Sequence, residues 1–284
     1  MHRSEESVTE TPTAVIDRLT LVLDAFDGHA RQTLAEIVHR TGLPRSSAHR
    51  MLERLVALRW LRRDGREYEL GMRLVELGSL AIHQDRLHAA ALPFLHELHR
   101  MTGFVVHLGV LQDNDVVYLE KVGENLGKAL PTRVGGKQPA HCTAIGKVLL
   151  AHADQGQSDP NQAGPGHAGT QRLERKTRFS IASTTQLSKE LDSVRDRGVA
   201  VEREEAVPRF GCIAVPIGEP GEATAAISIC GPVDQMKFDN RLAAPLRMAA
   251  LGAWRNAGGS DLRITPTLQQ RRPMISRQHL PVAG

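Results

Sequence analysis

A run of polar and basic side chains between residues 44 and 66 has the composition of a nucleic-acid contact surface. Residues 45–50 are Arg-Ser-Ser-Ala-His-Arg, so hydroxyl, imidazole and guanidinium groups surround one small apolar residue. A guanidinium can bind guanine through two hydrogen bonds or pair with a phosphate, and a serine hydroxyl can approach either group closely. The candidate DNA-contacting residues are Thr33, Arg45, Ser46, Ser47, His49, Arg50, Arg54, Arg62, Arg63 and Arg66.

Positive charge is concentrated in the same segment. Residues 45–66 contain seven arginines and two acidic residues, whereas residues 1–71 contain eleven arginines and eleven acidic residues. A local positive patch attracts a phosphate backbone even where the net charge of the domain is zero. The overall charge of +4 carries no such information, because residues 255–284 account for all of it.

A second candidate site lies at residues 143–145, where a predicted helix begins directly after Pro139-Ala140-His141-Cys142. Unpaired amides and the helix dipole make a helix N-terminus an anion-binding position. The donors here are the backbone amides of Ala144 and Ile145, so their apolar side chains are no obstacle. Ser228 and Cys230 are two residues apart in a predicted strand and therefore share one of its faces.

A cysteine–histidine hydrolase is the competing interpretation, with Cys142 or Cys212 as nucleophile. No nucleophile elbow, HExxH motif, paired-glycine dinucleotide motif or metal-ligand spacing accompanies them, so we expect no enzyme, no cofactor and no metal. His107 and His141 are expected to be structural. A winged-helix module that contacts only proteins is a third possibility.

The cysteines and the N-terminal segment indicate a cytoplasmic protein. Cys142, Cys212 and Cys230 are odd in number and form no CxxC pair, so we expect free thiols rather than disulfides. The first fifteen residues contain three acids and no apolar core of a secretion signal. No apolar run approaches the ~20 residues that a membrane-spanning helix needs.

The elements that must position the first candidate site are predicted over residues 12–71. Apolar residues recur with helical spacing over 12–26, and Thr33–Glu36 form a capping box that opens a second helix. A third helix starts at Pro44 and turns its apolar positions inward, leaving its polar face outward. Asp64-Gly65 within an alternating segment predicts a hairpin. An ordinary solvated basic face on a small helical domain is the alternative.

The rest of the chain mixes helices and antiparallel strands, so the predicted fold class is α+β. Residues 153–171 are rich in Gly, Gln, Asp and Pro, which is typical of a surface loop. Residues 257–284 are predicted to be a basic, disordered tail. Helices are expected over 72–99, from 143, over 187–198 and up to about 254, and strands over 104–111, 116–122, 212–217 and 224–230.

Both halves resemble one family in the same order. The segment TLAEIVHRTGLPRSSAHRMLERLVALRWLRRDGREYELGMRLVELG is similar to the winged helix-turn-helix of the IclR family of bacterial transcriptional regulators. PAHCTAIGKVLLA and RDRGVAVEREEAVPRFGCIAVPI, followed by AAISICGP, resemble its effector-binding domain. The likeness spans about residues 14–256, and the 153–171 segment departs from it where a helix usually continues in the family.

The resemblance implies a winged helix-turn-helix over 12–71, a linker and dimerisation helix over 72–87, and a GAF-like effector domain with an antiparallel sheet over 88–256. In the family, carboxylate effectors accept hydrogen bonds at the position of Ala144 and Ile145. Cys212 matches a cysteine that lines the pocket, and Glu202 stands where a pocket acid is expected, with Glu204 and Glu205 nearby. Core packing is the alternative for Cys212 and for Cys230, where relatives often carry serine.

The prediction is a ligand-responsive regulator that acts as a homodimer or a dimer of dimers. It binds a near-palindromic operator in double-stranded DNA, with recognition helices about one helical turn (~34 Å) apart. A small organic acid, an aromatic one included, shifts the relative pose of the two DNA-binding heads. The predicted effector-binding residues are Ala144, Ile145, Glu202, Cys212, Ser228 and Cys230.

Overall fold

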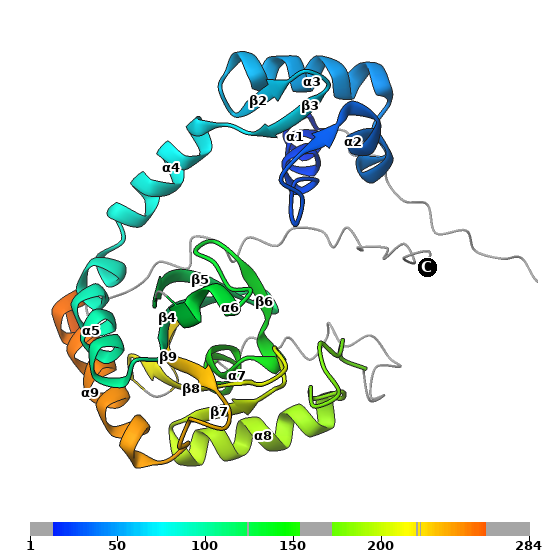
Figure 1. Ribbon diagram of the computed structural model, residues 1–284. Coiled ribbons are helices and arrows are strands. Elements are labelled where there is room, and N and C mark those ends of the chain that lie inside the picture. The colour runs from blue at the N-terminus through cyan, green and yellow to red at the C-terminus, as the bar shows by residue number, and fades with distance from the viewer. Residues whose placement is uncertain (1–13, 124, 154–171, 220, 222, 260–284) are drawn as a thin grey trace, which may run out of the picture. The chain divides into compact units, whose positions relative to one another are not determined.

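The computed structural model describes residues 14–123, 125–153, 172–219, 221 and 223–259. The chain divides into two compact units between Gln84 and Asp85 (Figure 1). Of the tail predicted over 257–284, residues 260–284 lie outside the described residues, and Ala257 is the buried last residue of α9 and not part of a tail. Residues 154–171 of the loop predicted over 153–171 also lie outside them. Among the helices that are described, none is both long and apolar enough to cross a membrane.

The first unit is a helix-turn-helix followed by a β-wing. Its core joins Val22 of the first helix, Ile37 of the second, Leu52 of the third and Tyr68 of the wing, all buried. The two predicted wing strands pair as expected, and a two-residue strand before the second helix adds to them, giving the order β1-β3-β2. The elements are α1 (Val15–Asp24), β1 (Gln32–Thr33), α2 (Leu34–Thr41), α3 (Arg45–Ala57), β2 (Leu61–Asp64), β3 (Glu67–Leu70) and α4 (Met72–His83).

The helical stretch predicted over 72–99 is two helices in the structure. α4 ends at His83, and α5 begins at Arg86 and runs to Thr102. Asp85 separates them because its carboxylate accepts the His88 amide at 2.7 Å, which caps the start of α5. None of the residues of α4 is buried, although several of them are large and apolar.

The second unit is built on a six-stranded antiparallel sheet in the order β6-β5-β4-β9-β8-β7. The strands predicted over 104–111, 116–122, 212–217 and 224–230 are confirmed, and the sequence analysis missed the short strands at both edges. The elements after α5 are β4 (Val105–Gln112), β5 (Asp115–Val122), α6 (Asn125–Ala129), β6 (Lys137–Pro139), a 3₁₀ turn (Ala140–Cys142), α7 (Ala144–His152), α8 (Thr184–Arg197), β7 (Ala200–Arg203), β8 (Phe210–Ile217), β9 (Ala225–Pro232) and α9 (Asn240–Ala257).

Helices cover both faces of this sheet (Figure 1). α5 and α9 pack on one face, where alternate residues of β8 such as Ile213 and Val215 join their core. α7 packs on the other face against Ala214 and Ala226, and α8 packs on α7. Because successive strand residues point to opposite faces, the polar residues Cys212, Ser228 and Cys230 all lie on the α7 face.

Candidate functional sites

The predicted recognition helix is held by a capped helix and a tight turn. Thr33 and Glu36 form the capping box: the Thr33 amide donates to Glu36 Oε2 at 2.7 Å, and the Thr33 hydroxyl accepts the Glu36 amide at 3.4 Å. α2 ends at Thr41, and the capping residue Gly42 that follows has the left-handed conformation, with φ of 67°. The buried residues Leu43 and Ala48 fix the orientation of α3 that follows.

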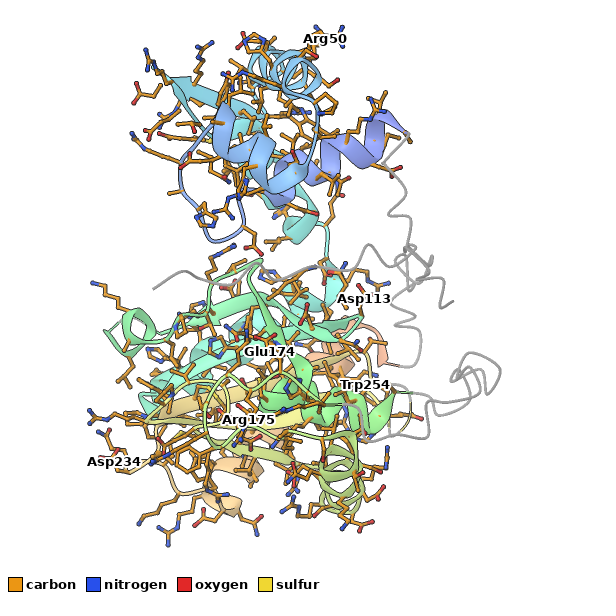
Figure 2. The ribbon with its side chains drawn as sticks, turned by 90° about the vertical axis from the view of Figure 1, so that its right-hand side faces the viewer. Arg50, Asp113, Glu174, Arg175, Asp234 and Trp254 are labelled. Carbon is orange, nitrogen blue, oxygen red and sulfur yellow. A yellow bond between two sulfur atoms is a disulfide. The ribbon has the colours of Figure 1, made fainter. Side chains whose placement is uncertain are left out.

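The outer face of α3 is open to solvent at the positions that the sequence singled out. Arg45, Ser46, His49 and Arg50 are exposed, and Ser47 is half-buried. Figure 2 shows Arg50 pointing away from the first unit. A shallow hollow on this face is lined by the four exposed side chains, Arg45, Ser46, His49 and Arg50, and by Leu34, the first residue of α2. This hollow places an apolar contact beside the hydroxyl, imidazole and guanidinium groups.

Two of the predicted wing cations are already paired within the first unit. Arg63 Nη1 lies 3.0 Å from Glu53 Oε1, and Arg62 pairs with Glu69. The hydrogen bond to Glu69 raises the pKa of Arg62. Within the part of the chain that the structure describes, no acidic partner pairs with Arg45, Arg50, Arg54 or Arg66.

All six predicted effector-binding residues line one cavity in the second unit. Ala144 and Ile145 come from α7, Glu202 from β7, and the others from β8 and β9. The cavity offers about 20 Å³ to the centre of a water molecule, enough for one water. Other residues in its wall are His107, Tyr118, Leu130, Thr132, Gln138, Thr143, Ala206, Val207 and Phe210.

The start of α7 presents two free amides at this cavity. The Thr143 hydroxyl accepts the Gly146 amide at 3.1 Å and so caps the helix. Among the described residues, no acceptor takes the amides of Ala144 or Ile145. Gly146 is required behind them, because a Cβ there would overlap the backbone of Ala140. The helix N-terminus therefore approaches the 3₁₀ turn closely and keeps two donors for a ligand.

Glu202 is the acid that faces the cavity, which resolves the choice among three neighbouring glutamates. It is 2% exposed, and burial raises the pKa of Glu202 to about 8 even though the Glu205 amide donates to its carboxylate at 3.0 Å. Glu205 instead pairs with the buried Lys147, with Nζ 2.6 Å from Oε1. At neutral pH the carboxyl of Glu202 is mostly protonated and can donate a hydrogen bond.

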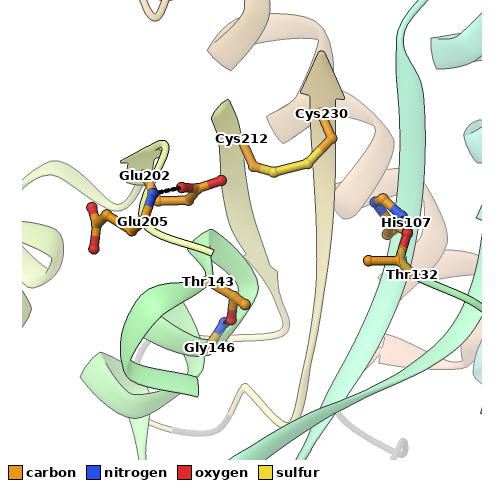
Figure 3. Close-up of a disulfide and its surroundings, with 8 residues drawn as sticks. All are labelled: His107, Thr132, Thr143, Gly146, Glu202, Glu205, Cys212 and Cys230. Carbon is orange, nitrogen blue, oxygen red and sulfur yellow. Dashed lines mark hydrogen bonds between the residues drawn. A yellow bond between two sulfur atoms is a disulfide. The ribbon is translucent and has the colours of Figure 1, made fainter. Parts of the chain in front are cut away.

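The expectation of three free thiols was wrong. Cys212 and Cys230 form a disulfide (Figure 3). Among the described cysteines only Cys142 is free. The two cysteines are paired in the register of β8 and β9, with their Cα atoms 4.2 Å apart. Sequence reasoning missed this pair because it rests on strand register and not on a local motif. The thiol-based argument for a cytoplasmic protein therefore falls away.

Neither cysteine proposed for a hydrolase is an available nucleophile. Burial raises the pKa of the Cys142 thiol to about 12, so almost none of it is thiolate at neutral pH. Cys212 is held in the disulfide.

His107, which the sequence predicts to be structural, lines the cavity at the start of α7. His107 Nε2 lies 2.9 Å from the Thr132 hydroxyl, and its ring centroid is 4.9 Å from that of Tyr118. Its position opposite Ser228 on the neighbouring strand brings it to the cavity, and no local sequence signal marks it. Thr132 and Tyr118 carry no local signal either: Tyr118 belongs to β5, the neighbour of β4 in the sheet, and Thr132 lies in the segment between α6 and β6.

Two family models match the two halves of the chain. The IclR helix-turn-helix domain matches residues 15–65, and the C-terminal domain of the bacterial transcriptional regulator IclR matches residues 79–253. The chain belongs to the IclR family of transcriptional regulators. IclR-family regulators bind DNA and small-molecule effectors, and the likeness offers no support for a hydrolase.

Curated and solved relatives cover most of this IclR-family chain. It is 32% identical to the regulator XynR of Escherichia coli over 75% of this chain and 84% of the relative. It is 32% identical to the regulator BhcR of Paracoccus denitrificans over 81% of each chain. An IclR homologue from Microbacterium hydrocarbonoxydans, solved in complex with 4-hydroxybenzoate, is 28% identical with a TM-score of 0.72, covering 86% of this chain and 99% of that one.

Proposed function

We propose that this IclR-family regulator reads its operator by placing α3 in the major groove. The observation that carries the proposal is the exposed face of α3, where Arg45 and Arg50 stand free of acidic partners among the described residues beside Ser46 and His49. Such groups are suited to base edges, while the wing residues are suited to the flanking phosphates. Arg54 and Arg66, which also lack an acidic partner among the described residues, would meet the backbone.

The functional form is a homodimer or a pair of dimers. α4 supports this proposal because it exposes apolar side chains along a helix with no buried residue: Met72 is 65% and Val75 is 62% exposed. Apolar surface of this kind on a linker helix favours association with a second copy. A two-fold dimer presents two copies of α3 and therefore requires a near-palindromic operator.

The effector is a small organic acid whose carboxylate binds the amides of Ala144 and Ile145. Protonated Glu202 supports this assignment because it can donate a hydrogen bond to an anion without repelling it. The Ser228 hydroxyl adds a further polar contact in the wall. The relative bound to 4-hydroxybenzoate favours an aromatic acid.

The cavity must widen to admit such a ligand, and this provides the coupling to DNA. Its wall includes Ala206, Val207 and Phe210, which belong to or follow a loop that contains two strained residues. Glu204 and Arg209 have φ of 57° and 66° without being glycine. An effector that binds only the widened form shifts the population toward it.

The protein works in the cytoplasm, where its DNA is, and performs no catalysis.

Retardation of the DNA that flanks the coding region in a native gel tests the DNA-binding proposal. The Ser47→Ala/Arg50→Ala variant should lose about 1–3 kcal/mol of binding free energy, roughly 5- to 150-fold in affinity. Arg241→Ala, an exposed arginine at the start of α9, is the matched control and should bind like the wild type. Unchanged operator binding by the double variant would remove α3 from the interface.

Thermal shift with 4-hydroxybenzoate as probe tests the effector site. Binding to the folded protein raises the melting temperature, and the Ser228→Ala variant should reduce that increase. If the increase is the same in the variant, this cavity is not the site that the probe occupies. If the wild type shows no increase with this or other aromatic carboxylates, the assignment of the effector class is wrong.

A further inference from the structure

Three side chains that can bind a metal stand in one row across the sheet. Glu202 on β7 pairs in register with Cys212 on β8, and Cys212 pairs with Cys230 on β9. Side chains at paired positions lie on the same face, so all three point toward the cavity (Figure 3). Residues 202, 212 and 230 are far apart in sequence, which is why motif spacing predicts no metal site here.

The ligand atoms of these three residues lie near one another, with the two sulfurs bonded to each other in the disulfide. One carboxylate oxygen and the two sulfurs lie within 4.8 Å of one another. Bonds of about 2.3 Å to sulfur and about 2.0–2.2 Å to oxygen place tetrahedral ligands roughly 3.5–3.8 Å apart. Once the disulfide is cleaved, rotation of the Cys212 and Cys230 side chains must separate the two sulfurs to this spacing.

The surroundings of Glu202 also suit a ligand. It is 2% exposed and Cys230 is 4% exposed, so little water competes for the position. The Glu205 amide donates to Glu202 Oε2 at 3.0 Å, which fixes the direction of the carboxylate. Hydrogen bonds of this kind to a ligating group orient it and are a regular feature of metal sites.

We propose that the reduced form of the protein binds one Zn²⁺ ion through Glu202, Cys212 and Cys230. A thiol reductant supplies two electrons and two protons, which cleave the sulfur–sulfur bond into two thiols and leave the reductant as its own disulfide. Zn²⁺ then binds the two sulfurs as thiolates and Glu202 as a carboxylate, and the protons of all three groups leave to solvent. The disulfide form is the metal-free form, because its sulfurs carry no negative charge to bind the ion.

Three protein ligands leave the fourth position of a tetrahedral zinc ion open to the cavity. Water fills such a position in known zinc sites, and an anion can replace it. Ala144 and Ile145 line the same cavity, so a carboxylate there could contact both the ion and their amides. The zinc site itself does not depend on the proposed effector and is tested without one.

Zinc titration of the full-length protein against a chromogenic chelator tests the proposal. Wild type reduced with a dithiol, which is then removed under nitrogen, should take one Zn²⁺ per chain from the chelator. Cys212→Ser should lose this binding, and Glu202→Gln should weaken it by at least about tenfold. Cys142→Ser is the matched control, because it removes the one free cysteine of the described residues and should bind like the wild type. Co²⁺ in place of zinc should give a thiolate charge-transfer band.

A variant could lose zinc binding only because it fails to fold. The oxidised wild type is free of this ambiguity, because its sequence is unchanged. It should leave all zinc on the chelator, and binding should return when the disulfide is reduced again. The proposal is overturned if the reduced wild type takes no zinc, which would make the pair a disulfide only. It is equally overturned if Cys212→Ser binds as tightly as the wild type, which would place the ion on other residues.

Discussion

Arg63 in the wing and Glu53 on α3 form an ion pair, with Nη1 3.0 Å from Oε1. The Tyr68 hydroxyl also lies 3.3 Å from the same carboxylate oxygen, and the Arg63 guanidinium lies 5.6 Å from the centroid of the Tyr68 ring. These contacts fasten the wing to the recognition helix. They also neutralise Arg63, one of the predicted DNA-contacting residues, so the wing carries less positive charge than its number of arginines suggests.

Glu53→Gln is expected to strengthen DNA binding. The substitution removes a negative charge beside the phosphate-facing surface and releases Arg63 for a phosphate. Affinity at low salt should rise, and the slope of log affinity against log salt should become steeper by about 1. Fluorescence anisotropy with labelled operator DNA at several salt concentrations measures both quantities.

The control for this variant is Glu97→Gln, which breaks the comparable exposed pair of Glu97 with Arg100 in the second unit. It should leave the affinity and the slope unchanged. Weaker binding by Glu53→Gln would mean that the ion pair positions Arg63 for DNA instead of withholding it.

Thr33→Ala is expected to destabilise the first unit by about 1 kcal/mol. The threonine is the N-cap of α2, and replacing such a cap by alanine leaves a backbone amide without its acceptor. Glu36 depends on the same contact, since hydrogen bonds from Thr33 lower the pKa of its carboxyl. Hydrogen exchange of the α2 amides and urea unfolding should both report the loss.

Thr20→Ala is the matched control for the cap. The Thr20 hydroxyl donates to the Ile16 carbonyl within α1, a bond that adds little to helix stability. Its unfolding midpoint should stay near that of the wild type. Equal effects of the two substitutions would show that the loss comes from the threonine side chain in general and not from capping.

Sequence patterns predicted those parts of the fold in which the signal is local. The capping box at Thr33–Glu36, the turn at Asp64-Gly65 and the helix after Thr143 were all found because a few adjacent residues specify them. β7, at Ala200–Arg203, was missed because four residues carry no periodicity, and only its pairing with β8 makes it a strand.

The residues of the candidate sites also divide into those with a local sequence signal and those without one. Arg50 and its neighbours follow from the helical face that they share, and Ser228 and Cys230 follow from strand alternation. His107 in the cavity and the bond between Cys212 and Cys230 depend on which strands are neighbours and in which register. No short-range pattern in one sequence contains that information.

Gly146→Ala is expected to destabilise the second unit and weaken binding of the carboxylate probe. The added Cβ would overlap the backbone of Ala140, so either α7 or the 3₁₀ turn must shift. Overpacking of this kind costs about 1–3 kcal/mol, and the shift also displaces the two free amides. Gly78→Ala in α4 is the control, because nothing lies within 4 Å of its Cβ and alanine favours a helix. Equal stability of the Gly146→Ala variant would refute the close approach.

His107→Gln is expected to reduce the loss of stability in acid. Burial and the nearby Lys121 lower the pKa of His107 to about 3 in the folded protein, against about 6.5 in an unfolded chain. Between these two values the unfolded state binds more protons, so the free energy of unfolding falls as the pH decreases from about 6.5 toward 3. This one group contributes a decrease of up to about 1.4 kcal/mol per pH unit in that window.

Urea unfolding at pH 7, 6 and 5 measures this contribution as the difference in slope between wild type and variant. Glutamine can keep a hydrogen bond to Thr132 but does not titrate, so the variant should lose less stability than the wild type between pH 6.5 and 5. His39→Gln, at an exposed position of α2, is the control for removal of one imidazole. Parallel pH profiles for wild type and His107→Gln would mean that His107 takes up a proton in the fold as easily as in the unfolded chain.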